Sequence, residues 1–204
     1  MMNLASSSLD NIKRAWEEDL DRPLSEDTWN CVLKQVHSSS ICARHSLIQF
    51  KVVHRAHISK VKLAQMFPGT NPMCNRCQCA EGTLIHMFWT CPKLEHYWRS
   101  IFLTLSAVLQ HRLEPEPLVA LFGVAPEEVW LSASMCKVLA FSSLIARRAI
   151  LLKWKDPLPP THTQWIKDMM SCLSLEKIRY SLRGSEKQFF KLWCSFIEYV
   201  DKSV

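Results

Sequence analysis

The sequence predicts an all-α fold built from several helices. Apolar residues recur every three or four positions along most of the 204 residues, which is the spacing of one face of a helix. Glycine occurs only four times, too rarely for a fold rich in β-hairpins. The apolar content of 48%, which includes eight tryptophans, is enough to form a buried core. We therefore expect a folded multi-helix protein and not a disordered chain.

The first third of the chain contains four predicted helical segments. An apolar stripe from Leu9 to Leu20 forms the first segment, and Pro23 ends it. Ser25 is the expected N-cap of the second segment, because its hydroxyl can accept a hydrogen bond from a free backbone amide. A third helix is expected over about 41–57 and a short helical turn over 59–67.

The rest of the chain is also predicted to be helical. The clearest loop is PGTNP at 68–72. After Pro92 the apolar spacing predicts one helix face, made of Leu94, Trp98, Ile101, Leu105 and Val108. Three further helices are expected over about 127–155, 162–182 and 186–201, and Gly184 is the expected cap and hinge between the last two.

Charge is distributed unevenly along the chain. Residues 1–30 contain seven acidic side chains, whereas residues 28–80 contain no Asp or Glu. We therefore divide the chain into an acidic helical segment or linker, 1–40, and a main helical domain, 41–204. A long segment without carboxylates favours a polyanionic partner. Its cations are Lys34, Arg44, Lys51, Arg55, Lys60, Lys62 and Arg76.

The N-terminal sequence lacks the apolar run of a secretory signal. We therefore expect an intracellular protein, cytoplasmic or nuclear, in which the nine cysteines are free thiols or metal ligands. The apolar stretch 129–146 raises the question of a membrane span. Lys137 at its centre favours a buried helix instead.

Residues 73–91, MCNRCQCAEGTLIHMFWTC, contain the pattern C-x2-C-x8-H-x4-C. The pattern offers Cys74, Cys77, His86 and Cys91 as four ligands for one tetrahedral Zn²⁺ ion. Four protein ligands leave no position for water, so the site would be structural and not catalytic. We expect a zinc loop over 73–92 that staples the helical part, 93–204, to the preceding segment.

Alternatives to this ligand set stay open at the level of spacing. Cys79 could replace Cys77 as a ligand, or pair with it as a redox couple. His96 could replace His86. The cysteines could also be ordinary core residues, as we expect for Cys31, Cys136, Cys172 and Cys194 on apolar helix faces.

The sequence gives little support to an enzyme. It contains no G-x-S-x-G, no phosphate-binding Gly-Lys loop and no H-E-x-x-H motif. The acidic sequences DLD at 19–21 and EPEP at 114–117 fit a helix end and a proline-broken loop better than a pair of catalytic carboxylates. We therefore expect no catalytic activity from this chain.

Several stretches resemble the C-terminal zinc-binding domain of the reverse-transcriptase polyprotein encoded by LINE-type (non-LTR) retrotransposons. They are IQFKVVHRAHISKVKLAQMFP, CNRC, GTLIHMFWTCPKLEHYW, LLKWK, PPTHTQWIKDMM and LEKIRYSLRG, in that order. The resemblance implies that Cys74, Cys77, His86 and Cys91 are the zinc ligands. It departs at Asn75, where many relatives have Trp. Such domains are thought to help grip element RNA or target DNA, and no Tyr-x-Asp-Asp polymerase motif is present here.

The predicted function is accordingly a non-catalytic, zinc-stabilised domain that binds RNA or DNA through its phosphates. Cations of the carboxylate-free segment are the candidate contacts, and Trp89 is a candidate for stacking on bases. The alternatives are an ordinary solvated face, a structural or protein-interaction module, and a degenerate element remnant without nucleic-acid binding. The candidate nucleic-acid residues are Arg44, Lys51, Arg55, Lys60, Lys62, Arg76 and Trp89.

Overall fold

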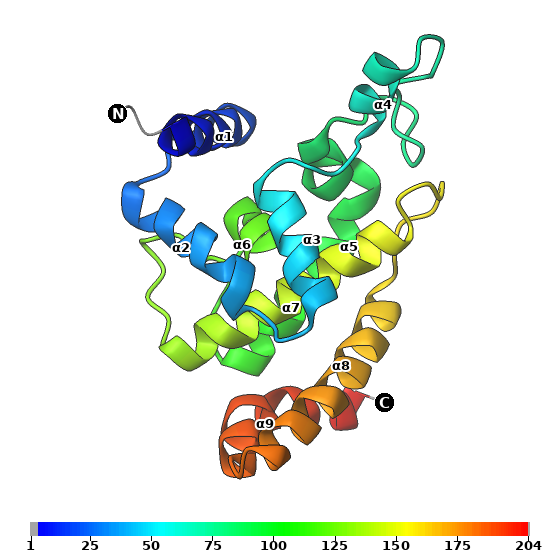
Figure 1. The fold of residues 1–204 in the computed structure, drawn as a ribbon. Helices are drawn as coiled ribbons and strands as arrows, with labels where there is room; N and C mark the ends of the chain where they lie inside the picture. The colour runs from blue at the N-terminus through cyan, green and yellow to red at the C-terminus, as the bar shows by residue number, and fades with distance from the viewer. Residues whose placement is uncertain (1–3, 204) are drawn as a thin grey trace.

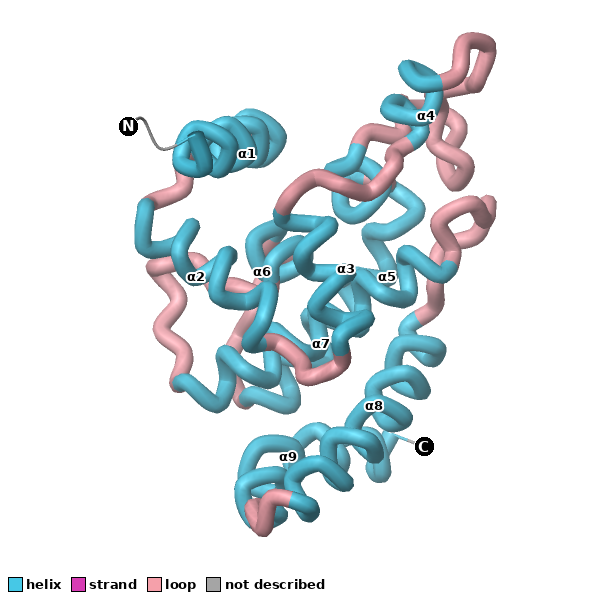
Figure 2. The backbone as a smooth tube through the Cα atoms, in the orientation of Figure 1, coloured by secondary structure: helices cyan, strands magenta, loops and turns pink. Residues whose placement is uncertain are grey.

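A computed structural model describes residues 4–203 of the chain, and the side chains of residues 9–202. The described part is helical, and its extended structure is one isolated bridge between Met73 and Glu81 (Figures 1 and 2). The predicted all-α fold is therefore confirmed. The elements are α1 (Leu4–Leu20), α2 (Glu26–Ser38), α3 (Ala43–Val53), α4 (Lys60–Met66), η1 (His86–Thr90), α5 (Pro92–Leu109), α6 (Pro117–Phe122), α7 (Ala133–Leu152), α8 (His162–Leu182) and α9 (Glu186–Ser203).

Hydroxyl caps fix the starts of four helices. The side chain of Ser25 accepts a hydrogen bond from the amide of Thr28, so the predicted N-cap of α2 is confirmed. Ser59, Ser132 and Thr161 do the same for α4, α7 and α8. Each cap satisfies one of the amides that a helix leaves free at its start.

Two predicted boundaries were wrong. The third helix is shorter than 41–57, because Arg55 adopts a left-handed backbone conformation with φ of 53° and the chain turns there. The helix expected from 127 begins at Ala133. Glu127 lies before it and accepts hydrogen bonds from Ser25 and Thr28 at the start of α2. The short helix α6 was not predicted.

The core is arranged around α7, which packs against α3, α6, α8 and α9 (Figure 1). Most of α7 is buried, because other helices pack against it on several sides. The prediction of a buried helix in this region is therefore confirmed. Within residues 4–203, no helix combines the length and the apolar character needed to cross a bilayer.

The N-terminal segment packs on the same core. The indole of Trp16 is fully buried, donates to the carbonyl of Val53 at 2.9 Å, and lies edge-on to Phe122 with 5.0 Å between ring centroids. Trp29 and Val32 of α2 are also core residues. The boundary near residue 40 remains a prediction, but Trp16, Trp29 and Val32, which precede it, belong to the core.

A buried cation joins three helices. Arg147 of α7 is fully buried and donates to the carbonyl of Ala120, 2.7 Å away, and to the side-chain oxygen of Gln49. Gln49 of α3 in turn donates to the carbonyl of Phe122 at 3.0 Å. The two acceptor carbonyls belong to the last turn of α6, where a helix has no partners of its own for them. These bonds fix α3, α6 and α7 to one another.

Gly123 allows α6 to end directly against α7. Its φ is 72°, and a Cβ placed there would lie 2.8 Å from the Cα of Ala140. A side chain would therefore meet both an unfavourable backbone conformation and a backbone atom that cannot move aside.

Gly123→Ala should lower the free energy of unfolding by about 2 to 5 kcal/mol, the combined effect of a left-handed residue and an overpacked contact. Gly184→Ala is the matched control, because Gly184 has φ of 64° but open space around its Cα. It should lower the free energy by only about 1 kcal/mol. Urea denaturation of both variants measures the difference, and equal losses would contradict the close approach to Ala140.

Candidate metal centre

Four side chains meet between the loop after α4 and the start of α5. The ligand atoms of Cys74, Cys77, His86 and Cys91 all lie within 4.8 Å of one another. The sulfurs of Cys74 and Cys91 are 3.9 Å apart, and Cys77 Sγ is 3.3 Å from His86 Nε2. Metal–ligand lengths of about 2.3 Å for sulfur and 2.0 Å for nitrogen give tetrahedral edges of about 3.8 and 3.5 Å. The cluster could therefore hold a metal ion.

A tight turn brings the first two cysteines together. The amide of Gln78 donates to the carbonyl of Cys74 at 3.0 Å, and the amide of Cys74 donates to Ala80 at 2.9 Å. Gln78 has a φ of 57°, which reverses the chain within a few residues. Cys74 and Cys77 consequently face the same point from one short loop.

A π-helical turn aligns the second pair. The amide of Cys91 donates to the carbonyl of His86 at 3.2 Å, so the bond spans five residues. In an α-helix, residues five apart would point about 140° away from each other at about 100° per residue. The wider π-turn reduces this angle, so both side chains can face one point. This local widening allows an H-x4-C spacing to supply two ligands to one site.

Two side chains bond the carbonyls of this turn. Trp98 of α5 donates its indole N–H to Phe88, 2.8 Å away, and Arg76 donates to the carbonyl of Met87. Arg76 is only 5% exposed. Its assignment as a nucleic-acid contact was therefore wrong, because a buried guanidinium cannot reach a phosphate. Arg76 stabilises the π-helical turn from within the protein, through its hydrogen bond to Met87.

The cysteines differ in how readily they ionise. Burial opposes ionisation of Cys77, but hydrogen bonds from the backbone and side chain of Cys79 lower its pKa. Hydrogen bonds from His86 and Cys74 act in the same direction, and the pKa of Cys77 falls to about 6. Burial raises the pKa of the Cys91 thiol to about 11, although nearby Arg76 acts against that rise. A metal ion bound by both residues would have to displace a proton from Cys91.

The competing ligands lie outside the cluster. Cys79 is exposed next to Cys77, and His96 is exposed on α5. Neither belongs to the set of four side chains that meet. Of the cysteines expected in the core, Cys136, Cys172 and Cys194 are half-buried, and burial raises the pKa of Cys136 and Cys172. The prediction was wrong for Cys31, which is exposed.

The candidate nucleic-acid residues are not equally placed. Arg44 and Lys62 are exposed, whereas Lys51 and Lys60 are half-buried. Arg55 does not project from α3 with them. It pairs with Asp19 at 2.6 Å, and its guanidinium lies 4.5 Å from the centre of the Trp16 ring. The pair with Asp19 offsets the charge of Arg55 and so disfavours a phosphate contact there, and that contact stays a prediction.

The side chain of Trp89 packs against α5 and is only partly exposed to solvent. It is half-buried, and its ring centroid lies 5.9 Å from that of Trp98. Packing against α5, which was the alternative to base stacking, accounts for this contact.

Sequence reasoning did not predict the contact between the metal loop and the segment that follows α7. Asn75, between two cluster cysteines, donates to the backbone carbonyl of Lys155 at 3.0 Å. Lys155 and Trp154 follow α7, about eighty residues later in the chain, and line one hollow together with Lys60. The sequence LLKWK at 151–155 was visible, but its position beside the loop depends on tertiary packing.

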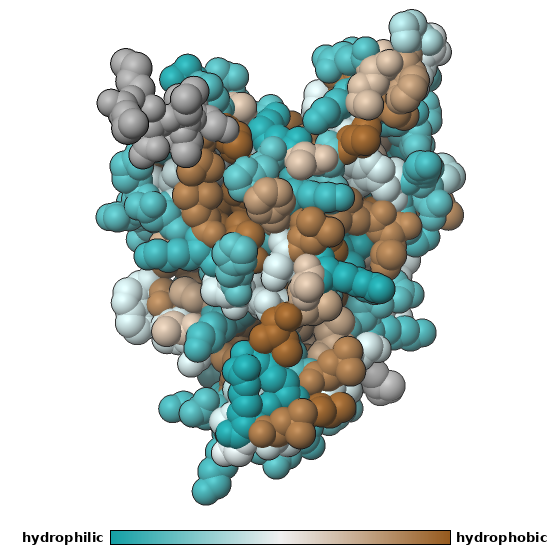
Figure 3. All heavy atoms as spheres, in the orientation of Figure 1, coloured by the Kyte–Doolittle hydropathy of each residue, from teal (hydrophilic) through white to brown (hydrophobic). Residues whose placement is uncertain are grey.

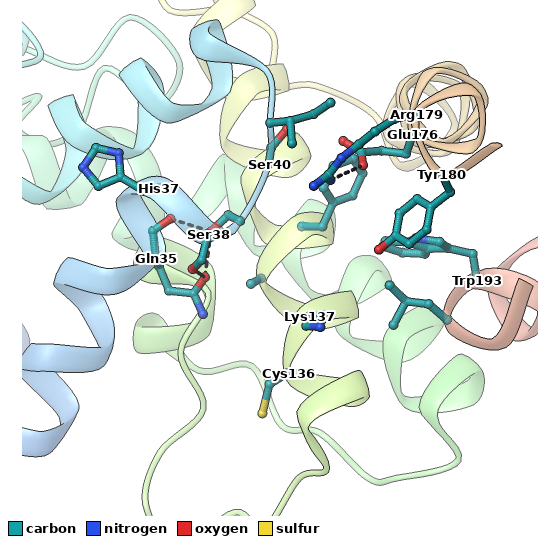
Figure 4. A pocket seen from close by; sticks show the side chains of 15 residues that line it. Gln35, His37, Ser38, Ser40, Cys136, Lys137, Glu176, Arg179, Tyr180 and Trp193 are labelled. Carbon is teal, nitrogen blue, oxygen red and sulfur yellow. Dashed lines mark hydrogen bonds and ion pairs between the residues drawn. The ribbon is translucent and has the colours of Figure 1, made fainter. Parts of the chain in front are cut away.

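A separate polar cavity of about 470 Å³ lies between the end of α2 and helices α7, α8 and α9 (Figure 4). Glu176 and Arg179, both on α8, form an ion pair at its edge, 3.2 Å apart. Glu176 is the one carboxylate among the residues that line this cavity. The cavity therefore does not offer the paired carboxylates of acid–base catalysis.

No protein-family model matches this chain. What the cluster can do therefore follows from its four side chains and their contacts.

Cys77→Ser should abolish stoichiometric metal binding, because it removes one of the four side chains that meet. Cys79→Ser should leave the metal content unchanged, since its thiol lies outside the set. Elemental analysis of both proteins, purified under reducing conditions, gives the comparison. Loss of metal in the Cys79 variant alone would reverse the assignment.

Proposed function

We propose that this chain is a non-catalytic domain that binds RNA or DNA and is stabilised by Zn²⁺ at the cluster of Cys74, Cys77, His86 and Cys91. Three thiolates and one imidazole suit Zn²⁺, a redox-inert ion that accepts soft ligands in tetrahedral geometry. A site with four protein ligands has no open position for water or substrate. The ion would therefore fix the loop and would not act on a substrate.

Unpaired positive charge beside the cluster is the observation that carries the nucleic-acid proposal. Among the described residues, no carboxylate forms an ion pair with Arg44, Lys51, Lys60 or Lys62. Other cations of the chain do form ion pairs, as in Arg22–Glu116 and Arg148–Asp168, and residues 28–80 supply no carboxylate that could pair with these four. A surface of free cations attracts phosphates, and releasing counterions from them supplies binding free energy.

The retrotransposon origin belongs to the same proposal. The order C-x2-C, H-x4-C and then LLKWK supports it, since these pieces surround one loop in space. The chain would then be a separate domain of a reverse-transcriptase polyprotein. Its nucleic-acid contacts would be sequence-tolerant, because lysine contacts to phosphate carry no base information.

A second candidate function is a protein-interaction module. Leu175, Ile178 and Leu182 on α8 are 68%, 56% and 84% exposed and repeat at helical spacing. Figure 3 shows apolar side chains gathered at this end of the molecule, over α8 and α9. An exposed apolar stripe of this kind favours a helical protein partner. A chain that bound no nucleic acid would leave this as the better function.

Removal of Zn²⁺ at pH 7 should loosen residues 68–98, because metal binding free energy is folding free energy in small closed sites. Amide hydrogen exchange there should accelerate at least about tenfold, while α8 and α9 keep their protection. Unchanged exchange after chelation would contradict a stapling role, and a purified protein without zinc would contradict the cofactor.

Affinity for a single-stranded oligonucleotide should fall steeply with salt, with a log–log slope of about −0.7 for each phosphate contact. The double variant Lys51→Glu/Lys62→Glu should weaken binding at least about tenfold. Lys187→Glu/Lys191→Glu on exposed positions of α9 is the control with the same change in charge. Equal losses in the two variants would show that only net charge matters, and absence of binding by the native chain would refute the proposal.

A further inference from the structure

A groove beside the metal loop collects cations from distant parts of the chain. It has a volume of about 690 Å³ and is lined by the end of α3, residues 56–60, α4, Asn75 and the end of α7. Lys51, Lys60 and Lys155 line it, and no carboxylate does. Among the described residues, none of the three lysines forms an ion pair. The low-dielectric walls of a groove concentrate such charge.

The groove also offers an apolar surface next to these charges. Trp154 lines it together with Leu63 and Ile58, the last of which is 48% exposed. The indole N–H of Trp154 donates to the carbonyl of Ile58 at 3.0 Å, and the ring packs on Phe88 with 5.1 Å between centroids. The Trp154 ring is therefore held in place. Aromatic and aliphatic surface beside lysines suits a base and sugar that follow a phosphate.

His57 does not change this charge pattern at neutral pH. It lines the same groove, and burial lowers its pKa to about 4, an effect to which Lys51 adds. The imidazole is thus neutral, and the positive charge of the groove comes from the three lysines.

Two walls of the groove are attached directly to the metal loop. On one side, Gly82 packs against Lys60, so closely that a Cβ on Gly82 would lie 2.7 Å from that of Lys60. On the other side, Asn75 holds the backbone of Lys155 at 3.0 Å. The spacing between Lys60 and Lys155 consequently depends on the loop that the cluster closes.

We propose that this groove binds a phosphate-linked nucleotide of a single-stranded nucleic acid, with its phosphates on Lys51, Lys60 and Lys155 and its base against the Trp154 side. This inference rests on the proposed function and names its site. The volume lies within the range of about 300 to 1,000 Å³ that small ligands occupy. A duplex, whose bases are stacked inside, cannot place one nucleotide in such a groove without unpairing it.

The test uses the full chain with its metal and a fluorescent oligouridylate as the probe. The groove variant Lys51→Gln/Lys60→Gln/Lys155→Gln keeps polar, unbranched side chains and removes three charges. The control Lys187→Gln/Lys191→Gln/Lys202→Gln removes three charges from exposed positions of α9, outside the groove. We expect the groove variant to lose affinity at least about tenfold and its salt slope to become shallower by about 2, at about 0.7 per contact. The control should change affinity less than about threefold.

Equal losses in the two triple variants would overturn the groove while leaving the proposed function in place. Absence of binding by the native chain would refute the proposed function itself. A hairpin duplex that competes as well as oligouridylate would overturn the single-strand assignment. Uridine monophosphate that competes at the same concentration would do so as well, since the groove would then be a mononucleotide site.

Asn75→Ala provides a second, independent measurement. The variant retains all four cluster side chains and should keep its metal content, but it loses the hydrogen bond to Lys155. Oligouridylate affinity should fall about three- to tenfold, the effect of one lost neutral hydrogen bond of about 1 kcal/mol. An unchanged affinity would mean that Asn75 does not position the groove.

Discussion

The structure depends on a buried guanidinium that forms no ion pair with any carboxylate in the described part of the chain. Arg147 lies in the centre of the core, where taking an ion out of water costs several kcal/mol. Only acceptors with strong local dipoles can offset that cost, and the last carbonyls of α6 are such acceptors. Gln49 completes the arrangement by accepting from Arg147 and donating to Phe122. The short helix α6 thus contributes to the core by ending beside Arg147, where its last carbonyl oxygens accept the hydrogen bonds.

This arrangement also determines where the functional surface can lie. Gln49 fixes α3, and the helix continues directly to Lys51 and then to the turn at Arg55. The same α7 that carries Arg147 ends at Leu152, just before Trp154 and Lys155. The two segments that border the groove, one after α3 and one after α7, therefore both start from the junction that Arg147 and Gln49 form. The metal loop then joins them at their far ends, which leaves the groove supported at both.

The sequence was informative where structure is local. Helix periodicity predicted α1, α2, α5, α8 and α9 closely, and the cap at Ser25 followed from its hydroxyl. The spacing of the cysteines and His86 pointed to the four side chains that the fold brings together. Partners distant in sequence were out of reach. The sequence alone suggests that Arg76 and Arg55 are surface cations. In the structure Arg76 donates to the carbonyl of Met87, and Arg55 pairs with Asp19 of α1.

The hydrogen bond from Asn75 to Lys155 connects the metal loop to the wall of the groove, so binding at the two places would be coupled. Because Asn75 lies between two members of the cluster, a metal ion bound there and the proposed groove ligand would both act on the position of the same backbone carbonyl. Two ligands that stabilise one arrangement must raise each other's affinity by an equal factor. Occupation of the groove would therefore raise the affinity for the metal by the same factor by which the metal raises the affinity of the groove. Asn75, which would bind neither the metal nor the groove ligand, would then determine how large this shared factor is.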